Sequence, residues 1–324
     1  MNGRVNGRVS GRGLPGAARG ARAVEIAAQA KVNLRLRILA RETTGYHQLE
    51  TLFLRLALAD TVRVRRTSVA RTLDVVGDGD LTALGAPERN LAWHAADAYF
   101  DATGMKGGFA LEITKRIPVG GGLGGGSADA GAVLRALDAM ADEPLGAPAL
   151  LTLAAQLGAD VPFLASDHAY ALAWGRGERM LALAPPPSRA ALLIVPGFGV
   201  NTGAAYGWLA ESRDAADVAG GGETIALDPE ALSAWDSLAP LAENDFERVV
   251  AGRHPEIAEH VAALRSLGCI VAMMSGSGST VFGVGESSAF EFVAANAAHA
   301  VPGDEARYIR TRTASRVEPL SVIE

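Results

Sequence analysis

The chain has 324 residues, 49% of them hydrophobic and 20% charged, which is enough for a globular protein with two separate cores. Its net charge of -6 argues against a nucleic-acid-binding surface, and no run of about 18 apolar residues predicts a membrane span. The single cysteine, Cys269, lies in an apolar run and is typical of a reducing compartment, so we expect a cytoplasmic protein with a small buried thiol.

The first 22 residues form a basic extension that is rich in glycine. They include five arginines and no acidic residue, a composition that resembles a targeting peptide or a polyanion-binding arm. The glycines oppose an amphipathic helix, and we therefore interpret residues 1–22 as a disordered extension.

Strand-like alternation begins at residue 23, and in the stretch 23–38 Val32 and Leu34 face one side while Asn33 and Arg35 face the other. A turn is expected at 43–47, and strands at 49–64 and 73–76. A helix over 90–102 begins with Asn90 as its N-cap, and a strand over 109–117 precedes a glycine-rich loop. Helices follow over 130–140 and 148–157, the second with Gly158 as its C-terminal cap.

The second half continues the mixture of strands and helices. We expect a hairpin over 169–183 with Gly175 and Gly177 in its turn, a strand over 190–195 and a helix over 202–210. After a glycine-rich loop at 214–224, helices fill 229–267, strands 269–274 and 280–284 enclose a second glycine turn, and a helix and a strand near Tyr308 end the chain. The class is α+β, and we divide it into domains over 23–175 and 176–324.

The glycine-rich loop is the most informative stretch. Six of the seven residues 120–126 are glycine, and Ser127 stands where the following helix would be capped. The free amides at a helix N-terminus favour an anion, and phosphate is the expected one. Gly120, Gly122 and Gly125 match the G-x-G-x-x-G pattern of dinucleotide-binding sites, but that site lies in a first βα unit and this loop comes too late in the chain. A Walker phosphate-binding loop would need a lysine directly before the serine, where this chain has Gly126.

Three motifs lie in the order and rough spacing of those of the GHMP small-molecule kinases. They are Lys31-Val32-Asn33 with Gly45-Tyr46-His47, the loop 118–130, and the glycine turn 275–279; a Gly-Ala-Asp-Val-Pro stretch at 158–162 adds to the match. The chain most resembles the branch that serves non-mevalonate isoprenoid synthesis. The resemblance implies an N-terminal domain like ribosomal protein S5 domain 2, a ferredoxin-like C-terminal domain and an active site in the cleft between them.

The same resemblance implies transfer of the ATP γ-phosphoryl group to the 2-hydroxyl of a methylerythritol that carries a cytidine diphosphate. Lys31 and Asp160 would be the catalytic pair, with Asp160 as general base and Lys31 stabilising charge. The implied ATP-binding set is Asn90, Lys115, Pro118, Gly120, Gly121, Gly122, Leu123, Gly124, Gly125, Gly126 and Ser127, with Ser127 also near Mg²⁺. The implied substrate-binding set is Asn33, Tyr46, His47 and Tyr206, in which two tyrosine rings sandwich the cytosine and His47 binds its edge.

Several alternatives stay open at this stage. Lys115 is either a nucleotide contact or a surface charge, and Asn90 is either an adenine contact or only a helix cap. Thr44, Ala128 and Met274 depart from the family pattern, the last two by losing a hydroxyl that would contact phosphate. Another GHMP kinase of the homoserine or mevalonate type, a nucleotide-binding protein without catalysis and a nicotinamide oxidoreductase are the rival functions. We expect a monomer or weak dimer that binds a small molecule but neither nucleic acid nor membrane.

Overall fold

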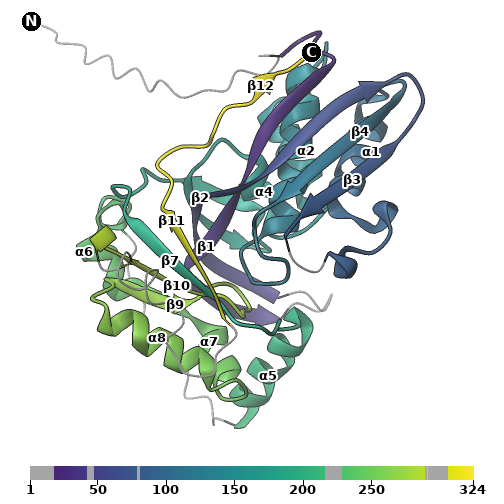
Figure 1. The fold of residues 1–324 in the computed structure, drawn as a ribbon. Coiled ribbons are helices and arrows are strands. Elements are labelled where there is room, and N and C mark those ends of the chain that lie inside the picture. Colours follow the sequence, from purple (N-terminus) through teal and green to yellow (C-terminus); the bar gives the residue numbers. More distant parts are fainter. Residues whose placement is uncertain (1–17, 42–46, 79–80, 216–227, 289, 291–305) are drawn as a thin grey trace, which may run out of the picture.

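The computed structural model describes residues 18–41, 47–78, 81–215, 228–288, 290 and 306–324, and its strands form two sheets (Figure 1). The larger sheet has the order β12-β1-β2-β4-β3, with β5 paired to β2, β6 to β5 and β8 to β1. Its strands are β1 (Ala23–Arg41), β2 (His47–Thr67), β3 (Thr72–Gly77), β4 (Gly108–Lys115), β5 (Tyr170–Gly175), β6 (Arg179–Ala182), β8 (Glu243–Asn244) and β12 (Ser321–Val322).

The smaller sheet has the order β11-β7-β10-β9, and all its neighbours are antiparallel. Its strands are β7 (Ala190–Val195), β9 (Val271–Met274), β10 (Val281–Gly285) and β11 (Arg307–Arg312). The helices are α1 (Leu91–Thr103), α2 (Gly125–Met140), α3 (Ala147–Ala155), α4 (Val161–Ala165), α5 (Thr202–Ala215), α6 (Trp235–Leu238), α7 (Asp245–Ala251) and α8 (Glu256–Ser266). None of these helices, within the ranges just given, is long and apolar enough to span a membrane.

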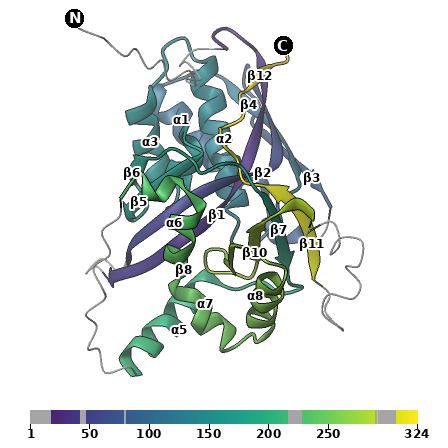
Figure 2. The ribbon, with the colours of Figure 1, turned by 90° about the vertical axis from the view of Figure 1, so that its left-hand side faces the viewer.

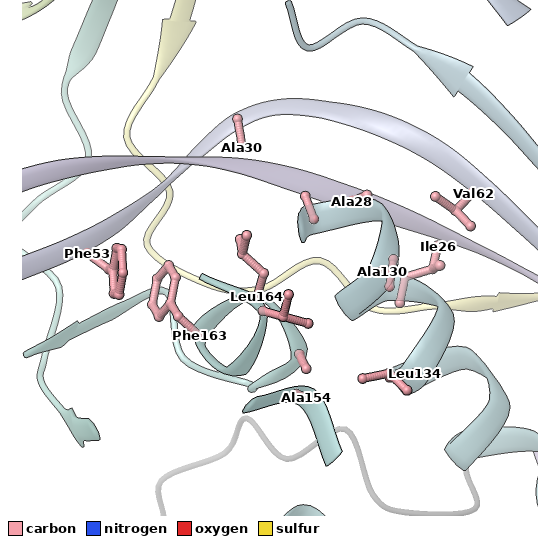
Figure 3. Packing of buried hydrophobic residues seen from close by; sticks show 14 of the residues in the cluster. Ile26, Ala28, Ala30, Phe53, Val62, Ala130, Leu134, Ala154, Phe163 and Leu164 are labelled. Atoms are coloured by element: carbon pink, nitrogen blue, oxygen red, sulfur yellow. The ribbon is translucent and has the colours of Figure 1, made fainter. Parts of the chain in front are cut away.

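The helices α1, α2 and α3 gather on one face of the larger sheet (Figures 1 and 2). Small and aliphatic side chains of α2, such as Ala130 and Leu134, pack there with Ile26 and Val62 of the sheet (Figure 3). The short helix α4 joins this core through Phe163, whose ring stacks on Phe53 of β2 with 4.9 Å between centroids. Apolar burial of this kind is the main favourable term that holds the layers together.

The smaller sheet is buried on both faces. In β7, Ala191 and Leu193 join the core of the larger sheet, while Leu192 and Ile194 join a second core with α5, α7 and α8. This explains why the segment reads as a continuous apolar run. Strand β1 also reaches both cores, since residues up to Leu34 belong to the first and Leu36 and Ile38 to the second.

Most of the predicted elements are confirmed, including the α+β class and the hairpin whose turn holds Gly175 and Gly177 at positive φ. The division expected between residues 175 and 176 falls inside that β5–β6 hairpin, so β6, which ends at Ala182, still belongs to the larger sheet. Gly158 is not the cap of α3, because that helix ends at Ala155 and its C-cap is Gln156. Residues 1–17, most of the expected extension, and most of the expected last helix lie outside the described residues.

Candidate functional site

Lys31 and Asp160 form an ion pair, with 3.2 Å between Lys31 Nζ and Asp160 Oδ2. Lys31 lies in β1 between two irregularities of the β1–β2 register, a placement that re-aims side chains beside functional sites. Its side chain is only 4% exposed, whereas that of Asp160, at the start of α4, is 30% exposed. The carboxylate is therefore open to a ligand while the ammonium behind it is held in place.

A chain of buried hydrogen bonds orients the Lys31 ammonium. Lys31 Nζ donates to Asn33 Oδ1 at 2.8 Å, and Asn33 Nδ2 donates to Thr51 Oγ1 at 2.8 Å. The Thr51 hydroxyl in turn donates to the carbonyl oxygen of Arg35, also at 2.8 Å. Because each buried polar group has its partner, the lysine is fixed in one orientation.

The glycine loop leads into α2 as expected, but its cap differs from the prediction. The helix begins at Gly125 and its N-cap is Gly124, which has a φ of 71° in the left-handed region. The prediction of Ser127 as the N-cap is therefore wrong, since Ser127 is the third residue of the helix and lies within its first turn. The first helical bond runs from Ala128 N to Gly124 O at 2.8 Å. The amides of residues 125–127 thus point out of the helix end, where an anion is favoured.

The second glycine turn is packed tightly against this loop. Ser275 Oγ donates to the carbonyl of Gly122 at 3.0 Å, and Thr280 N donates to that of Gly121 at 3.2 Å. A Cβ at Gly122 would lie 2.2 Å from the carbonyl oxygen of Ser275, and one at Gly276 would lie 3.5 Å from Lys31 Nζ. The two turns and the catalytic lysine predicted from the sequence therefore meet at one place, and only glycine permits so close an approach.

The glycine loop also contacts Lys31 directly. Lys31 N donates to the carbonyl of Leu123 at 3.0 Å, and the stem of Lys31 lies 3.0 Å from the position of a Cβ on Gly124. Leu123 and Pro118 are both buried, so their side chains support the loop from the protein side. Gly120 and Gly126 are exposed, and a Cβ at either would contact nothing within 4 Å.

Lys115 is buried rather than exposed, so its interpretation as a surface charge is wrong. Its ammonium pairs with Asp60 and, at 2.7 Å, with Asp129 Oδ2 of α2. Burial raises the pKa of Asp129 to about 7, against the opposing effect of Lys115, and the two carboxylates raise the pKa of Lys115 despite its burial. Its proposed nucleotide contact stays a prediction.

The structure describes two of the three aromatic residues expected around a pyrimidine, His47 and Tyr206. His47 and Tyr206 stack on each other, with 4.4 Å between ring centroids and 17° between planes. Phe246 stands nearly perpendicular to Tyr206, at 88° and 4.9 Å. Burial, and to a smaller degree the charge of Asp160, raises the pKa of Tyr206. Tyr46 and Thr44 lie outside the described residues, so the second ring of the sandwich stays a prediction.

Other expected residues take structural places. Asn90 caps α1 by accepting from Ala92 N at 2.9 Å, which confirms its capping role and leaves its adenine contact a prediction. Ala128 is buried in the main core, so its methyl group faces the core. Met274 is also buried, and its sulfur lies 2.7 Å from the position of a Cβ on Gly278.

Sequence reasoning missed two residues that support the site. Asn244 Nδ2 donates at 2.8 Å to the carbonyls of both Met274 and Gly276, which fixes the second glycine turn. Arg55 is fully buried and donates to four carbonyls near the C-terminal end of α4, the helix that follows Asp160. Neither belongs to a recognisable motif, because each acts through contacts with residues far away in the chain.

No group of three or more metal-ligating side chains occurs within the described ranges. The Ser127 hydroxyl at the start of α2 and the partly exposed Asp160 carboxylate are oxygen donors of the type that Mg²⁺ prefers. These two oxygen donors thus fit a Mg²⁺ ion.

Comparison with known proteins gives a consistent result. The model of the GHMP kinases N terminal domain matches residues 90–168, and that of the GHMP kinases C terminal domain matches 230–302. The chain is 38% identical to the 4-diphosphocytidyl-2-C-methyl-D-erythritol kinase of Solibacter usitatus over 81% of each chain. It is 36% identical to that of Citrifermentans bemidjiense over 86% of this chain and 95% of the other.

Solved structures agree in fold. A crystal structure of a 4-(cytidine 5'-diphospho)-2C-methyl-D-erythritol kinase is 35% identical, covers 89% of this chain and 98% of its own, and has a TM-score of 0.68. A homoserine kinase from Cytophaga hutchinsonii is 17% identical, covers 93% and 98%, and has a TM-score of 0.67, which is a likeness of fold alone. The two-domain fold expected from the sequence is confirmed.

Proposed function

Because the chain belongs to the 4-diphosphocytidyl-2-C-methyl-D-erythritol kinases of the GHMP superfamily, we propose that Asp160 and Lys31 carry its phosphoryl transfer. The reaction moves the γ-phosphoryl group of ATP to the 2-hydroxyl of 4-diphosphocytidyl-2-C-methyl-D-erythritol, in the non-mevalonate isoprenoid pathway. The observation that carries the proposal is the 3.2 Å pair of Lys31 and Asp160, set directly against the glycine loop at Gly124.

Asp160 accepts the proton of the 2-hydroxyl as this oxygen attacks the phosphorus. A carboxylate within hydrogen-bond reach of the hydroxyl is the group suited to this step, and Asp160 is exposed enough to receive it. Lys31 donates toward the same place and stabilises the negative charge on the attacking oxygen and the transferring group. Its bond to Asn33 keeps the ammonium aimed there while the substrate binds.

The main-chain amides of residues 125–127 and the loop before them hold the phosphates of ATP. Positioning of this kind supplies much of the acceleration in phosphoryl transfer, since the reaction needs little covalent help from the protein. The Ser127 hydroxyl would help to hold a Mg²⁺ ion, which would neutralise charge on the phosphates. Lys115 supports this loop from beneath through its pairs with Asp60 and Asp129.

The cytosine of the substrate is recognised by Tyr46, His47 and Tyr206. One face of the Tyr206 ring is covered by His47 in the structure. Stacking of a pyrimidine on that face therefore requires the His47 ring to move aside, and its nitrogens then become available to the edge of the base. Tyr46 closes the other face of the base.

The test uses purified protein with Mg-ATP and 4-diphosphocytidyl-2-C-methyl-D-erythritol, and follows the phosphorylated product by phosphorus NMR. Homoserine and mevalonate are offered as competing acceptors, and phosphorylation of either in place of the cytidine compound would refute the assignment. Asp160→Asn is expected to lose turnover while calorimetry still detects binding of a non-hydrolysable ATP analogue. Asp142→Asn, an exposed carboxylate of the same domain, is the control and keeps full activity.

A further inference from the structure

Asp60 of β2 is a fully buried carboxylate that is separate from the predicted catalytic pair. Its Oδ1 accepts hydrogen bonds from the amides of Arg116 at 2.5 Å and Ile117 at 2.8 Å, and its Oδ2 pairs with the Lys115 ammonium. Three consecutive residues of the chain therefore donate to one side chain. A buried carboxylate is costly unless it is fully paired, and here both oxygens are.

These three donors mark the entry to the phosphate loop. Strand β4 ends at Lys115, and the chain then turns toward Pro118 and the glycines. Two adjacent amides bound to one oxygen fix the direction in which the chain leaves the strand. If residues 116 and 117 took another path, the carboxylate of Asp60 would lose two of its partners inside the protein.

The same cluster also holds the exit of the loop. The Lys115 ammonium lies 2.7 Å from Asp129 Oδ2, which is in the second turn of α2. It also lies 3.4 Å from the position of a Cβ on Gly125, the first residue of that helix. Asp60 therefore holds the entry of the loop directly, and its exit through Lys115.

We propose that Asp60 is a positioning residue that sets the geometry of the phosphate loop by holding its two ends at a fixed separation. Because its side chain is fully buried, Asp60 acts through the amides of Arg116 and Ile117 and through Lys115 rather than by contact with ATP or the acceptor. The proposal deepens the proposed function, on which it rests for the identity of the nucleotide. It predicts a defect in ATP binding, since the acceptor-side residues Lys31 and Asp160 lie on other elements.

The experiment compares Asp60→Asn with Asp138→Asn in the full chain. Asp138 is the matched control because it is also a buried carboxylate, lies at the far end of α2, and accepts from Tyr99 Oη at 3.0 Å and Leu145 N at 2.7 Å. Both variants are expected to lower the melting temperature. Only Asp60→Asn is expected to weaken binding of a non-hydrolysable ATP analogue, by about tenfold or more, with the KM for the acceptor changed by less than about twofold.

Asp129→Asn is the second variant, in case Asp60→Asn does not fold. In this variant Lys115 keeps its pair with Asp60, and only its pair with Asp129, at the exit of the loop, is lost. We therefore expect a smaller loss of affinity for the ATP analogue than in Asp60→Asn, with the KM for the acceptor unchanged. Unchanged affinity in every folded loop variant, or an equal loss in Asp138→Asn, would overturn the proposal. The binding measurement separates it from the proposed function, because failure to phosphorylate the cytidine substrate would leave the difference in nucleotide affinity intact.

Discussion

Gly131 of α2 lies where that helix crosses the end of α4, and its replacement by alanine is expected to destabilise the protein. A Cβ at Gly131 would lie 2.6 Å from the carbonyl carbon of Leu164, 2.7 Å from its oxygen and 2.8 Å from the amide nitrogen of Ala165. All three are backbone atoms and cannot rotate away. The two helices must therefore separate, and the packing of Ala130 and Leu164 in the core must change with them (Figure 3).

The magnitude follows from two opposing effects. Alanine favours a helix over glycine by about 0.5–1 kcal/mol, whereas forcing an extra methyl group into a packed core costs about 1–3 kcal/mol. With three backbone contacts below 3.0 Å, the cost exceeds the gain, and the free energy of unfolding should fall by about 1–2 kcal/mol. Because α4 begins next to Asp160, kcat should fall as well.

Gly207→Ala in α5 is the matched control, since this glycine is exposed and a Cβ there would contact nothing within 4 Å. It should gain the helix propensity alone and become more stable by about 0.5–1 kcal/mol. Urea unfolding followed by tryptophan fluorescence measures both variants. If Gly131→Ala were as stable as Gly207→Ala, the close crossing of α2 and α4 would be refuted.

Three further predictions concern residues outside the glycine loop. Arg55→Met should lower the free energy of unfolding, because four carbonyls near α4 lose their donor. One unsatisfied buried group costs about 1–3 kcal/mol, so the loss should be at least that large. Arg63→Met, on the exposed part of the same strand, is the control and should leave the urea midpoint unchanged. Thr51→Val should reduce kcat with little change in the KM for ATP, since the amide of Asn33 loses the acceptor that orients it, and steady-state kinetics would contradict this if KM rose alone. Burial raises the pKa of the Cys269 thiol to about 11, so its reaction with a thiol reagent should accelerate about tenfold per pH unit up to pH ~10 in the folded protein. In the urea-unfolded protein the rate of the same reaction should stop rising near pH ~8.5, the ordinary pKa of a thiol. If the rate in the folded protein also stopped rising near pH ~8.5, the pKa of Cys269 would not be raised by burial.

The site was predictable where its residues act through local motifs. Lys31, Asp160 and the glycine turns stand in short patterns that can be read without knowing their partners, and the structure brings them together. The start of α2 was not predictable in the same way. Ser127 has the side chain of a cap, but Gly124 takes the left-handed conformation that ends the loop, and the helix begins before the serine is reached.

Lys115 illustrates a second limit. A lysine at the end of a strand reads as solvated, and nothing nearby in the sequence indicates burial. Its partners come from β2 and α2, and only the fold brings Asp60 and Asp129 to the same ammonium. Sequence periodicity therefore does not reveal a buried charged residue whose partners lie elsewhere in the chain. In the proposed arrangement, Lys115 and its two partners hold the glycine loop in place.

Strand β1 links these observations to the reaction. It packs into both cores, so the strand that carries Lys31 is fixed by both of them. The glycine loop is bound to that strand through the hydrogen bond from Lys31 N to the carbonyl of Leu123, and to the second glycine turn through Ser275 and Thr280. The proposed donor and acceptor sites are thus built on different elements but share one backbone contact at Lys31. In-line transfer needs the two oxygens and the phosphorus to stay aligned, and a shared strand meets that need with less loss of entropy on binding than two hinged halves would.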